Sequence, residues 1–222
     1  EYYSDTIVAA KSFIKLGLGR FESVSILGFN SPEWHLSNMG AIAAGGFAAG
    51  IYTTNEPPAC KYIAEHSAAR VIVVEGQKQL DKILAIRAEL PKLVAIVMYS
   101  GEPKAGINDG LGEGQAKVYS WSEFMALGKD VADSVVEERI AAQKPGHCCT
   151  LIYTSGTTGN PKAVMISHDN VTWTTRSNIK HHPDFVNGAL RVVSYLPLSH
   201  IAAQIVDIHS PMIYLADHGL PS

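Results

Sequence analysis

The sequence predicts an α/β fold in which layered βαβ units form a sheet covered by helices. Short apolar segments begin near Ser23, Phe47, Arg70 and Leu93, at a regular interval of about 23 residues. The stretches between them carry helix signals, so strands and helices alternate along the chain. The composition is that of a globular protein, because 46% of the 222 residues are hydrophobic and only 18% are charged.

Each interval between these strands contains the start of a helix. Ser31 and Pro32 form an N-cap and a first turn, and the double proline at Pro57 starts the next helix. The third such helix has apolar residues at helical spacing and ends before Pro91. An amphipathic helix precedes the first strand. Helices are therefore expected over residues 5–16, 32–45, 57–67 and 77–90.

The second half of the chain is expected to begin with a loop. Five glycines fall between Ser100 and Gln115, which indicates a flexible surface loop. The sequence Lys144-Pro145-Gly146 marks a boundary, and we expect a first lobe over residues 1–144 and the start of a second over 145–222. On the two sides of that boundary we expect helices over 120–128, 130–143, 168–179 and 200–209, strands over 148–154 and 162–166, and a further strand from Tyr214.

The most informative segment runs from Tyr153 to Lys162 and is rich in Ser, Thr and Gly. Glycines permit the close backbone approach that turns successive N–H groups toward an anion. The hydroxyl groups and the ammonium group of Lys162 add donors and a positive charge suited to phosphate. We therefore predict a nucleotide triphosphate site formed by Thr154, Ser155, Gly156, Thr157, Thr158, Gly159 and Lys162.

This segment is not a Walker A loop. Pro161 stands where the second glycine of that pattern belongs, and Ala163 replaces the hydroxyl residue after the lysine. A polar hairpin turn is the simple alternative, since Thr, Gly, Asn and Pro are ordinary turn residues. The order of the whole segment, ending in Pro-Lys, favours the phosphate site.

Composition and spacing disfavour several other classes of function. A net charge of −3 provides no basic surface for nucleic acid. Cys60, Cys148 and Cys149 form no CxxC pair, which suits a reducing compartment and predicts buried, inert thiols. No HExxH or comparable ligand spacing indicates a metal site. The uncharged window from Trp34 to Asn55 lacks the apolar density of a membrane span, and predicts a packed helix followed by a buried strand.

Three segments resemble the adenylate-forming enzymes, a family that includes acyl-CoA synthetases, luciferases and peptide-synthetase adenylation domains. The run from Tyr153 to His168 is similar to the family's phosphate loop, with Ala163 in place of the usual glycine. The run from Tyr195 to Gln204 resembles the second nucleotide and acyl motif, and the run from Gly28 to Trp34 resembles the N-terminal lobe. The similarity covers essentially all 222 residues and points to the bubblegum-type long-chain acyl-CoA synthetases.

This resemblance implies an ATP-dependent ligase that converts long-chain fatty acids to acyl-CoA through an acyl-adenylate, with Mg²⁺ and coenzyme A. It places His200 beside the adenylate and the acyl carboxylate, and it gives Lys162 a catalytic role at the phosphates. From the residues alone, His200 starts a helix capped by Ser199 and is satisfied by local hydrogen bonds. The family's adenine, ribose and C-terminal motifs are not among these residues. We therefore expect the N-terminal part of the large domain of such an enzyme, inactive by itself.

Two alternatives fit the same loop: another adenylate-forming ligase, such as an aryl-CoA ligase or a luciferase-like enzyme, and a non-catalytic nucleotide-binding module. The expected partners are a long-chain fatty acid, ATP and coenzyme A, and not nucleic acid. We expect a cytoplasmic location, with peripheral association with intracellular membranes as an open possibility.

Overall fold

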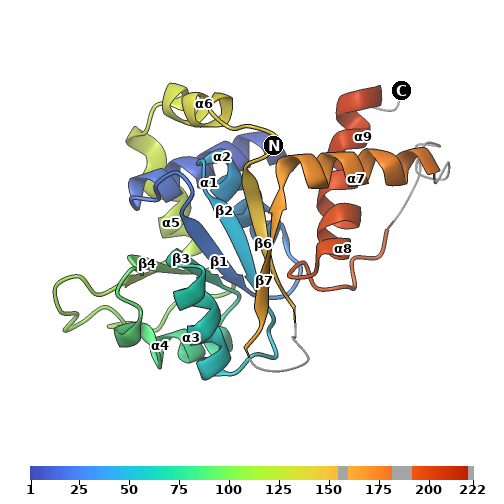
Figure 1. Cartoon of the computed structure of the whole chain (residues 1–222). Coiled ribbons are helices and arrows are strands. Elements are labelled where there is room, and N and C mark those ends of the chain that lie inside the picture. Colours follow the sequence, from blue (N-terminus) through green and yellow to red (C-terminus); the bar gives the residue numbers. More distant parts are fainter. Residues whose placement is uncertain (155–159, 182–191, 220–222) are drawn as a thin grey trace.

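The computed structural model describes residues 1–154, 160–181 and 192–219, and within them seven strands form one sheet (Figure 1). Six strands run parallel, and the last is antiparallel to its neighbour. In sheet order they are β5 (Lys117–Ser120), β4 (Ala95–Met98), β3 (Ala69–Val74), β1 (Ser23–Leu27), β2 (Phe47–Ile51), β6 (Cys148–Thr154) and β7 (Lys162–Ser167). The α/β fold predicted from the sequence is confirmed.

Helices cover both faces of this sheet. α1, α2 and α5 contribute to one buried hydrophobic cluster, and α3 and α4 contribute to a second. Side chains of β1 alternate between them, with Ile26 in the first cluster and Leu27 in the second. The helices are α1 (Tyr2–Lys15), α2 (Pro32–Ala43), α3 (Pro57–His66), α4 (Gln77–Leu84), η1 (Arg87–Glu89), α5 (Trp121–Leu127), η2 (Gly128–Asp130), α6 (Asp133–Ala141), α7 (His168–His181), α8 (Ile201–Ala203), the π-helix η4 (Gln204–His209) and α9 (Ser210–His218).

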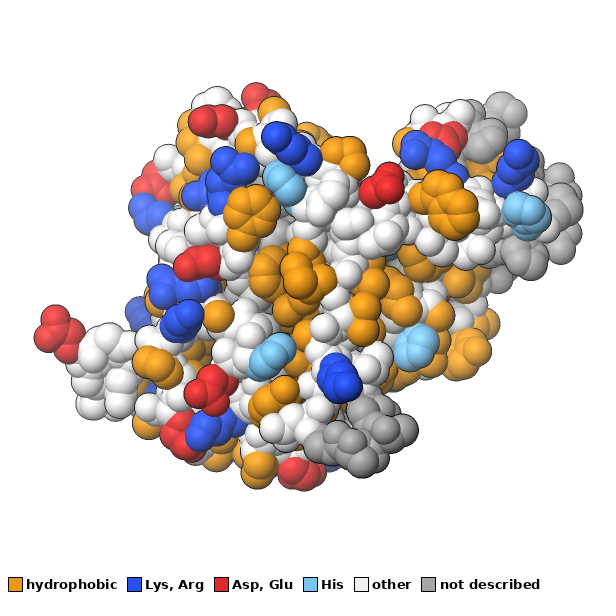
Figure 2. All heavy atoms as spheres, viewed as in Figure 1, with side chains coloured by type: hydrophobic (Ala, Val, Ile, Leu, Met, Phe, Trp, Pro, Cys, Tyr) orange, Lys and Arg blue, Asp and Glu red, His pale blue; other side chains and the backbone are white. Residues whose placement is uncertain are grey.

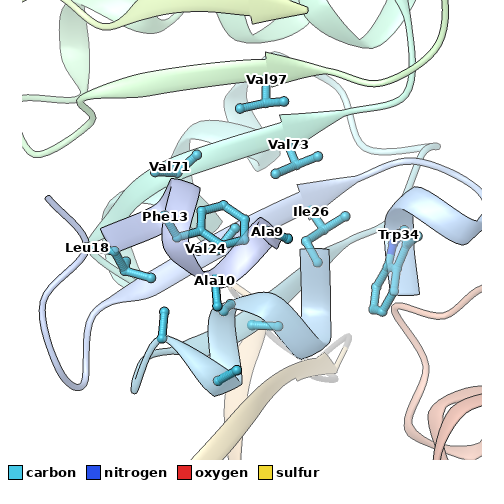
Figure 3. Packing of buried hydrophobic residues seen from close by; sticks show 14 of the residues in the cluster. Ala9, Ala10, Phe13, Leu18, Val24, Ile26, Trp34, Val71, Val73 and Val97 are labelled. Atoms are coloured by element: carbon cyan, nitrogen blue, oxygen red, sulfur yellow. The ribbon is translucent and has the colours of Figure 1, made fainter. Parts of the chain in front are cut away.

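The first cluster shows why β1 lies near the middle of the sheet. Figure 3 shows Phe13 of α1 and Trp34 of α2 on either side of Ile26, and all three side chains are fully buried. Every residue of β1 is buried. A strand covered by helices on both faces has no solvent-facing side, so its sequence is a continuous run of small and apolar residues rather than an alternating one.

Two helix starts have side-chain caps, and the cap at Ser31 is the one that the sequence predicts. The hydroxyl oxygen of Ser31 accepts the N–H of Trp34 at 3.1 Å, at the start of α2. Ser120 and Glu123 form a capping box at the start of α5. These side chains satisfy N–H groups that the first turn of a helix leaves without a backbone partner.

The structure corrects the prediction around β5. The interval between residues 115 and 120 was expected to lead directly from a loop into a helix, but Lys117–Ser120 pairs with β4 as a parallel strand. This strand has four residues and only part of it is buried, so its apolar pattern is too short to recognise. The predicted helix over 77–90 also ends early, at Leu84, and a short 3₁₀ turn follows it.

A second correction concerns the segment after residue 200. A strand was expected from Tyr214, but α9 spans residues 210–218 and includes that position. A short apolar run does not distinguish strand from helix, and Pro211 in the first turn favours the helix. The N-cap of α8 is His200, not Ser199 as predicted.

The sheet continues across the boundary predicted at residue 144. β6 follows that boundary and pairs with β2 in parallel. The division into a lobe over 1–144 and a second over 145–222 therefore stays a prediction.

The window from Trp34 to Asn55 forms α2 and then β2, as predicted. Among the residues that the structure describes, no helix has the length and apolar character needed to cross a membrane.

Candidate functional site

The predicted phosphate segment connects the two strands of a hairpin. Thr154 at the end of β6 lies opposite Lys162 at the start of β7, and both residues are exposed. The Thr154 hydroxyl donates to the carbonyl of Lys162 at 3.5 Å. Five predicted site residues, Ser155, Gly156, Thr157, Thr158 and Gly159, lie outside the described residues. The described part therefore places the two ends of the segment side by side at one edge of the sheet.

The residue that departs from the family pattern is accommodated in this hairpin. Ala163 pairs with Tyr153 across the two strands and packs against the second hydrophobic cluster. Its methyl group therefore contacts apolar neighbours and takes no donor away from the loop.

Helix α3 supports the base of the hairpin, which the sequence did not reveal. The Tyr62 hydroxyl donates to the carbonyl of Pro161 at 3.1 Å, immediately before Lys162. One turn later, His66 Nδ1 lies 3.0 Å from the Tyr153 hydroxyl, and its ring stacks on that of Tyr62. Burial raises the pKa of Tyr153 to about 12, so the phenol stays neutral. The only sequence signal was the spacing of Tyr62 and His66 on one helix face.

The same hairpin also carries exposed apolar side chains, one on each of its faces. Val164 and Met165 of β7 are exposed, Met165 by 71%. Figure 2 shows hydrophobic side chains gathered on one face of the molecule, over β6 and β7. The hairpin thus combines a polar loop end with exposed apolar side chains.

His200 lies at the same edge of the sheet as the phosphate segment. It is exposed at the N-terminus of α8, where its Nδ1 accepts the N–H of Ala202 at 3.2 Å. The preceding residue, Ser199, packs directly on Gly50 near the end of β2, because a Cβ added to Gly50 would lie 2.7 Å from Ser199 Cα. β2 and β6 are parallel neighbours, so their carboxyl ends meet at one edge. That edge is the usual ligand position in open α/β sheets.

A family model described as "AMP-binding enzyme" matches residues 1–222. The chain belongs to the AMP-binding enzyme family.

Relatives within the AMP-binding family are named long-chain-fatty-acid–CoA ligases. The chain is 53% identical to ACSBG2 of Xenopus laevis over 219 residues, which are 96% of this chain and 28% of that protein. It is 51% identical to ACSBG1 of Homo sapiens, over 94% of this chain and 28% of that protein. The chain therefore spans less than a third of the length of these relatives. The predicted resemblance to bubblegum-type synthetases is confirmed.

Solved structures agree on the AMP-binding fold. The anthranilate CoA ligase AuaEII in complex with anthranoyl-AMP matches 79% of this chain and 30% of its own, with 27% identity and a TM-score of 0.60. ATP-bound MatB from Rhodopseudomonas palustris matches 96% of this chain and 38% of its own, with a TM-score of 0.70. At 17% identity, MatB shows the shared fold alone.

Two cysteines of this AMP-binding chain lie in β6, and the third, Cys60, lies in α3. Cys60 and Cys149 are buried as predicted, while Cys148 is only half-buried. Burial raises the pKa of Cys60 to about 11 and that of Cys149 to about 12, and it also raises the pKa of Cys148. These thiols therefore stay protonated near neutral pH and are poor nucleophiles.

Proposed function

We propose that the whole protein activates long-chain fatty acids with ATP and transfers the acyl group to coenzyme A. The observation that carries this proposal is the identity of 53% and 51% to long-chain-fatty-acid–CoA ligases across nearly all of this chain. An aryl-acid substrate has weaker support, because the anthranilate CoA ligase is only 27% identical. A non-catalytic nucleotide-binding role has no comparable support among these relatives.

The proposed first step joins the carboxylate to AMP. A carboxylate oxygen of the fatty acid attacks the α-phosphorus of ATP, the bond to the β-phosphate oxygen breaks, and pyrophosphate leaves. In the second step the sulfur of coenzyme A attacks the acyl carbon, the bond from that carbon to the phosphate oxygen breaks, AMP leaves and the thiol proton is released. The first step brings an anion to a polyanion, so it requires fixed positive charge and N–H donors at the phosphates.

Lys162 has the chemistry and position for that task. The residue is exposed and pairs with Thr154, the last residue of β6, at the carboxyl edge of the sheet. A charge-assisted contact to phosphate oxygens would offset the negative charge that develops on the departing pyrophosphate. We assign the neighbouring loop residues 154–159 to the same phosphate groups, as the sequence predicts.

For His200 we propose contact with the acyl carboxylate and the adenylate. Because Nδ1 accepts the N–H of Ala202, the neutral ring carries its proton on Nε2. An Nε2–H donor suits a carboxylate oxygen or the acyl carbonyl of the adenylate. The local hydrogen bond expected for a helix-start histidine and the proposed catalytic contact therefore use different nitrogens.

The described residues do not form a protein cage for Mg²⁺. They contain no group of three or more His, Cys, Asp or Glu side chains that could hold a metal ion. Mg²⁺ commonly binds through substrate phosphates with few protein ligands, so we propose that it enters with ATP and neutralises phosphate charge there. We assign no residue to Mg²⁺ or to coenzyme A.

Product analysis with the whole protein tests this function. With ATP, Mg²⁺, palmitate and coenzyme A, we expect AMP, pyrophosphate and palmitoyl-CoA. Anthranilate and benzoate in place of palmitate serve as the matched aryl controls. Formation of ADP and phosphate, or a requirement for an aryl acid, would contradict the proposal.

Two further parts of the proposal concern the protein as a whole. We propose that residues 1–222 alone do not complete the reaction, because they correspond to 28% of the related ligases. We also propose a cytoplasmic location, with peripheral association with intracellular membranes as the open alternative. Cell fractionation tests the location, and release of the membrane fraction by salt or carbonate would distinguish peripheral attachment from insertion.

A further inference from the structure

We propose that Asn30 is a positioning residue for the adenylation reaction, acting through the backbone turn that precedes His200. The proposal rests on the function proposed above, in which His200 contacts the acyl group. Asn30 follows β1 directly before the Ser31 cap, and it lies far from His200 in the sequence.

The Asn30 side chain bonds three points of the segment before His200. Its Nδ2 donates to the Ser194 hydroxyl at 2.7 Å and to the Leu196 carbonyl at 2.9 Å. Its Oδ1 accepts the N–H of Leu198 at 2.9 Å. One amide group therefore fixes alternate residues of this segment, and both of its polar atoms are used.

The same segment is held from the helix side by Gln204. Gln204 is fully buried at the start of η4, and its Nε2 donates to the carbonyl of Leu198 at 2.9 Å. Asn30 and Gln204 thus hold the N–H and the C=O of one residue, Leu198, whose side chain is also fully buried. Asp207 extends the network by accepting the Ser194 hydroxyl at 2.5 Å.

The sheet supports the turn from a third direction. Ser199 lies against Gly50 of β2, with no space for a methyl group between them. The two residues before His200 are therefore fixed by Asn30, Gln204 and the backbone of β2. Because the His200 ring is exposed, these contacts rather than packing around the ring determine where it lies.

Loss of Asn30 should shift His200 without removing it. Asn30→Ala leaves Leu196 and Leu198 without their side-chain partners, so the turn can relax away from the sheet edge. A misplacement of about 1 Å in a catalytic group can cost about a hundredfold in rate. We expect kcat for acyl-adenylate formation to fall about ten- to a hundredfold. The KM for ATP should change by less than about threefold, since the described contacts of Asn30 do not include the phosphate hairpin.

Asn108→Ala is the matched control. Asn108 also bonds the N–H and the C=O of one residue, Val118. Val118 lies in β5, the outermost strand on the side of the sheet opposite β7. Asn30→Ala, Asn108→Ala, His200→Ala and the double variant Asn30→Ala/His200→Ala are compared in the whole protein by palmitate-dependent ATP–pyrophosphate exchange. We expect wild-type kcat in Asn108→Ala. The double variant should be as active as His200→Ala alone, because residues that act through one group are not additive. If the losses of kcat in the two single variants multiply in the double variant, or if kcat is unchanged in Asn30→Ala, the inference is overturned.

Gly50→Ala tests the turn without touching Asn30. The added methyl group must displace Ser199, so the same loss of kcat is expected, whereas Gly146→Ala adds a methyl group to open space. Amide hydrogen exchange gives a readout besides activity, since the Leu198 N–H should exchange faster in Asn30→Ala and not in Asn108→Ala. Unchanged exchange at Leu198 would also overturn the inference. If the wild-type protein shows no palmitate-dependent exchange, the proposed function itself fails; if it is active and Asn30→Ala matches Asn108→Ala, only the role of Asn30 fails.

Discussion

The sheet and the segment that carries His200 are stabilised in different ways. β1 is buried on both faces and bonded to a strand on each side, so many small contributions hold it in place. The turn before His200 lies at the edge of the sheet and depends on individual atoms of Asn30, Gln204 and Gly50. Changes in the hydrophobic clusters that cover the sheet should therefore reduce stability while the activity per folded molecule is kept. Changes at the edge should reduce activity while stability is kept.

The largest expected effect is in the buried cluster between α1 and the sheet. Phe13 is fully buried, and its ring centroid lies 4.8 Å from that of Phe124. Phe13→Ala should lower the free energy of unfolding by about 3–5 kcal/mol, because it leaves a cavity between α1 and the sheet. Denaturant unfolding measures this free energy, with the variant Tyr3→Ala as the control because Tyr3 is exposed. A loss of less than about 1 kcal/mol would contradict the described packing.

A pH effect on stability is expected from His209, a buried residue of η4 that lies outside the turn before His200. Burial, aided by His168 and His35, lowers the pKa of His209 to about 4. The neutral ring is therefore favoured in the folded state. The free energy of unfolding should not depend on His209 above about pH 6.5, where the ring is neutral in both states. It should fall by up to about 3 kcal/mol as the pH falls toward 4, because the unfolded state then binds a proton that the folded state does not.

His209→Leu should flatten this decline, whereas His181→Leu at the exposed end of α7 should not. Denaturant unfolding between pH 4 and pH 7 measures both variants, relative to wild type. An equal decline in all three proteins would show that other groups cause it.

Lys162 tests the edge through activity. Lys162→Ala removes a charge-assisted phosphate contact that contributes about 1.5–3 kcal/mol. The kcat/KM for ATP should therefore fall about ten- to 150-fold. The melting temperature should stay close to that of the control Lys129→Ala, which removes another exposed charge, from η2. A sharp fall in melting temperature with normal activity per folded molecule would make the lysine structural.

The smallest effect is expected at the base of the hairpin. Tyr62→Phe removes only the hydroxyl that donates to the carbonyl of Pro161. A hydrogen bond of this kind contributes about 0.5–1.5 kcal/mol, so the KM for ATP should rise about two- to tenfold with little change in kcat. Steady-state kinetics decides this, and a fall in kcat alone would indicate that α3 acts elsewhere.

The same contrast explains what could be predicted from the sequence. β1 to β4 and the helices between them were visible because burial leaves a local pattern of apolar runs, caps and prolines. The edge contacts leave none, because Asn30 is an ordinary polar residue beside a helix cap until residues 194–198 fold against it. The strand prediction from Tyr214 is wrong for a related reason. The apolar run over residues 214–216 is too short to show a helical or a strand period, and the helix signal lies in the residues before it. Lys162 was identifiable from the chemistry of its loop and His200 from the family resemblance. That both lie at the same edge could be seen only once the sheet was known.

The proposed reaction, in which a carboxylate attacks the α-phosphate of ATP, is tested most directly by an isotope label. The label follows the oxygen atoms of the carboxylate. The whole protein is incubated with ATP, coenzyme A and palmitate that carries ¹⁸O in both carboxylate positions. The masses of the products are then measured by mass spectrometry. If the carboxylate attacks the α-phosphorus, each turnover transfers one ¹⁸O to AMP and none to pyrophosphate. Label in inorganic phosphate with formation of ADP, or AMP without label, would contradict the account.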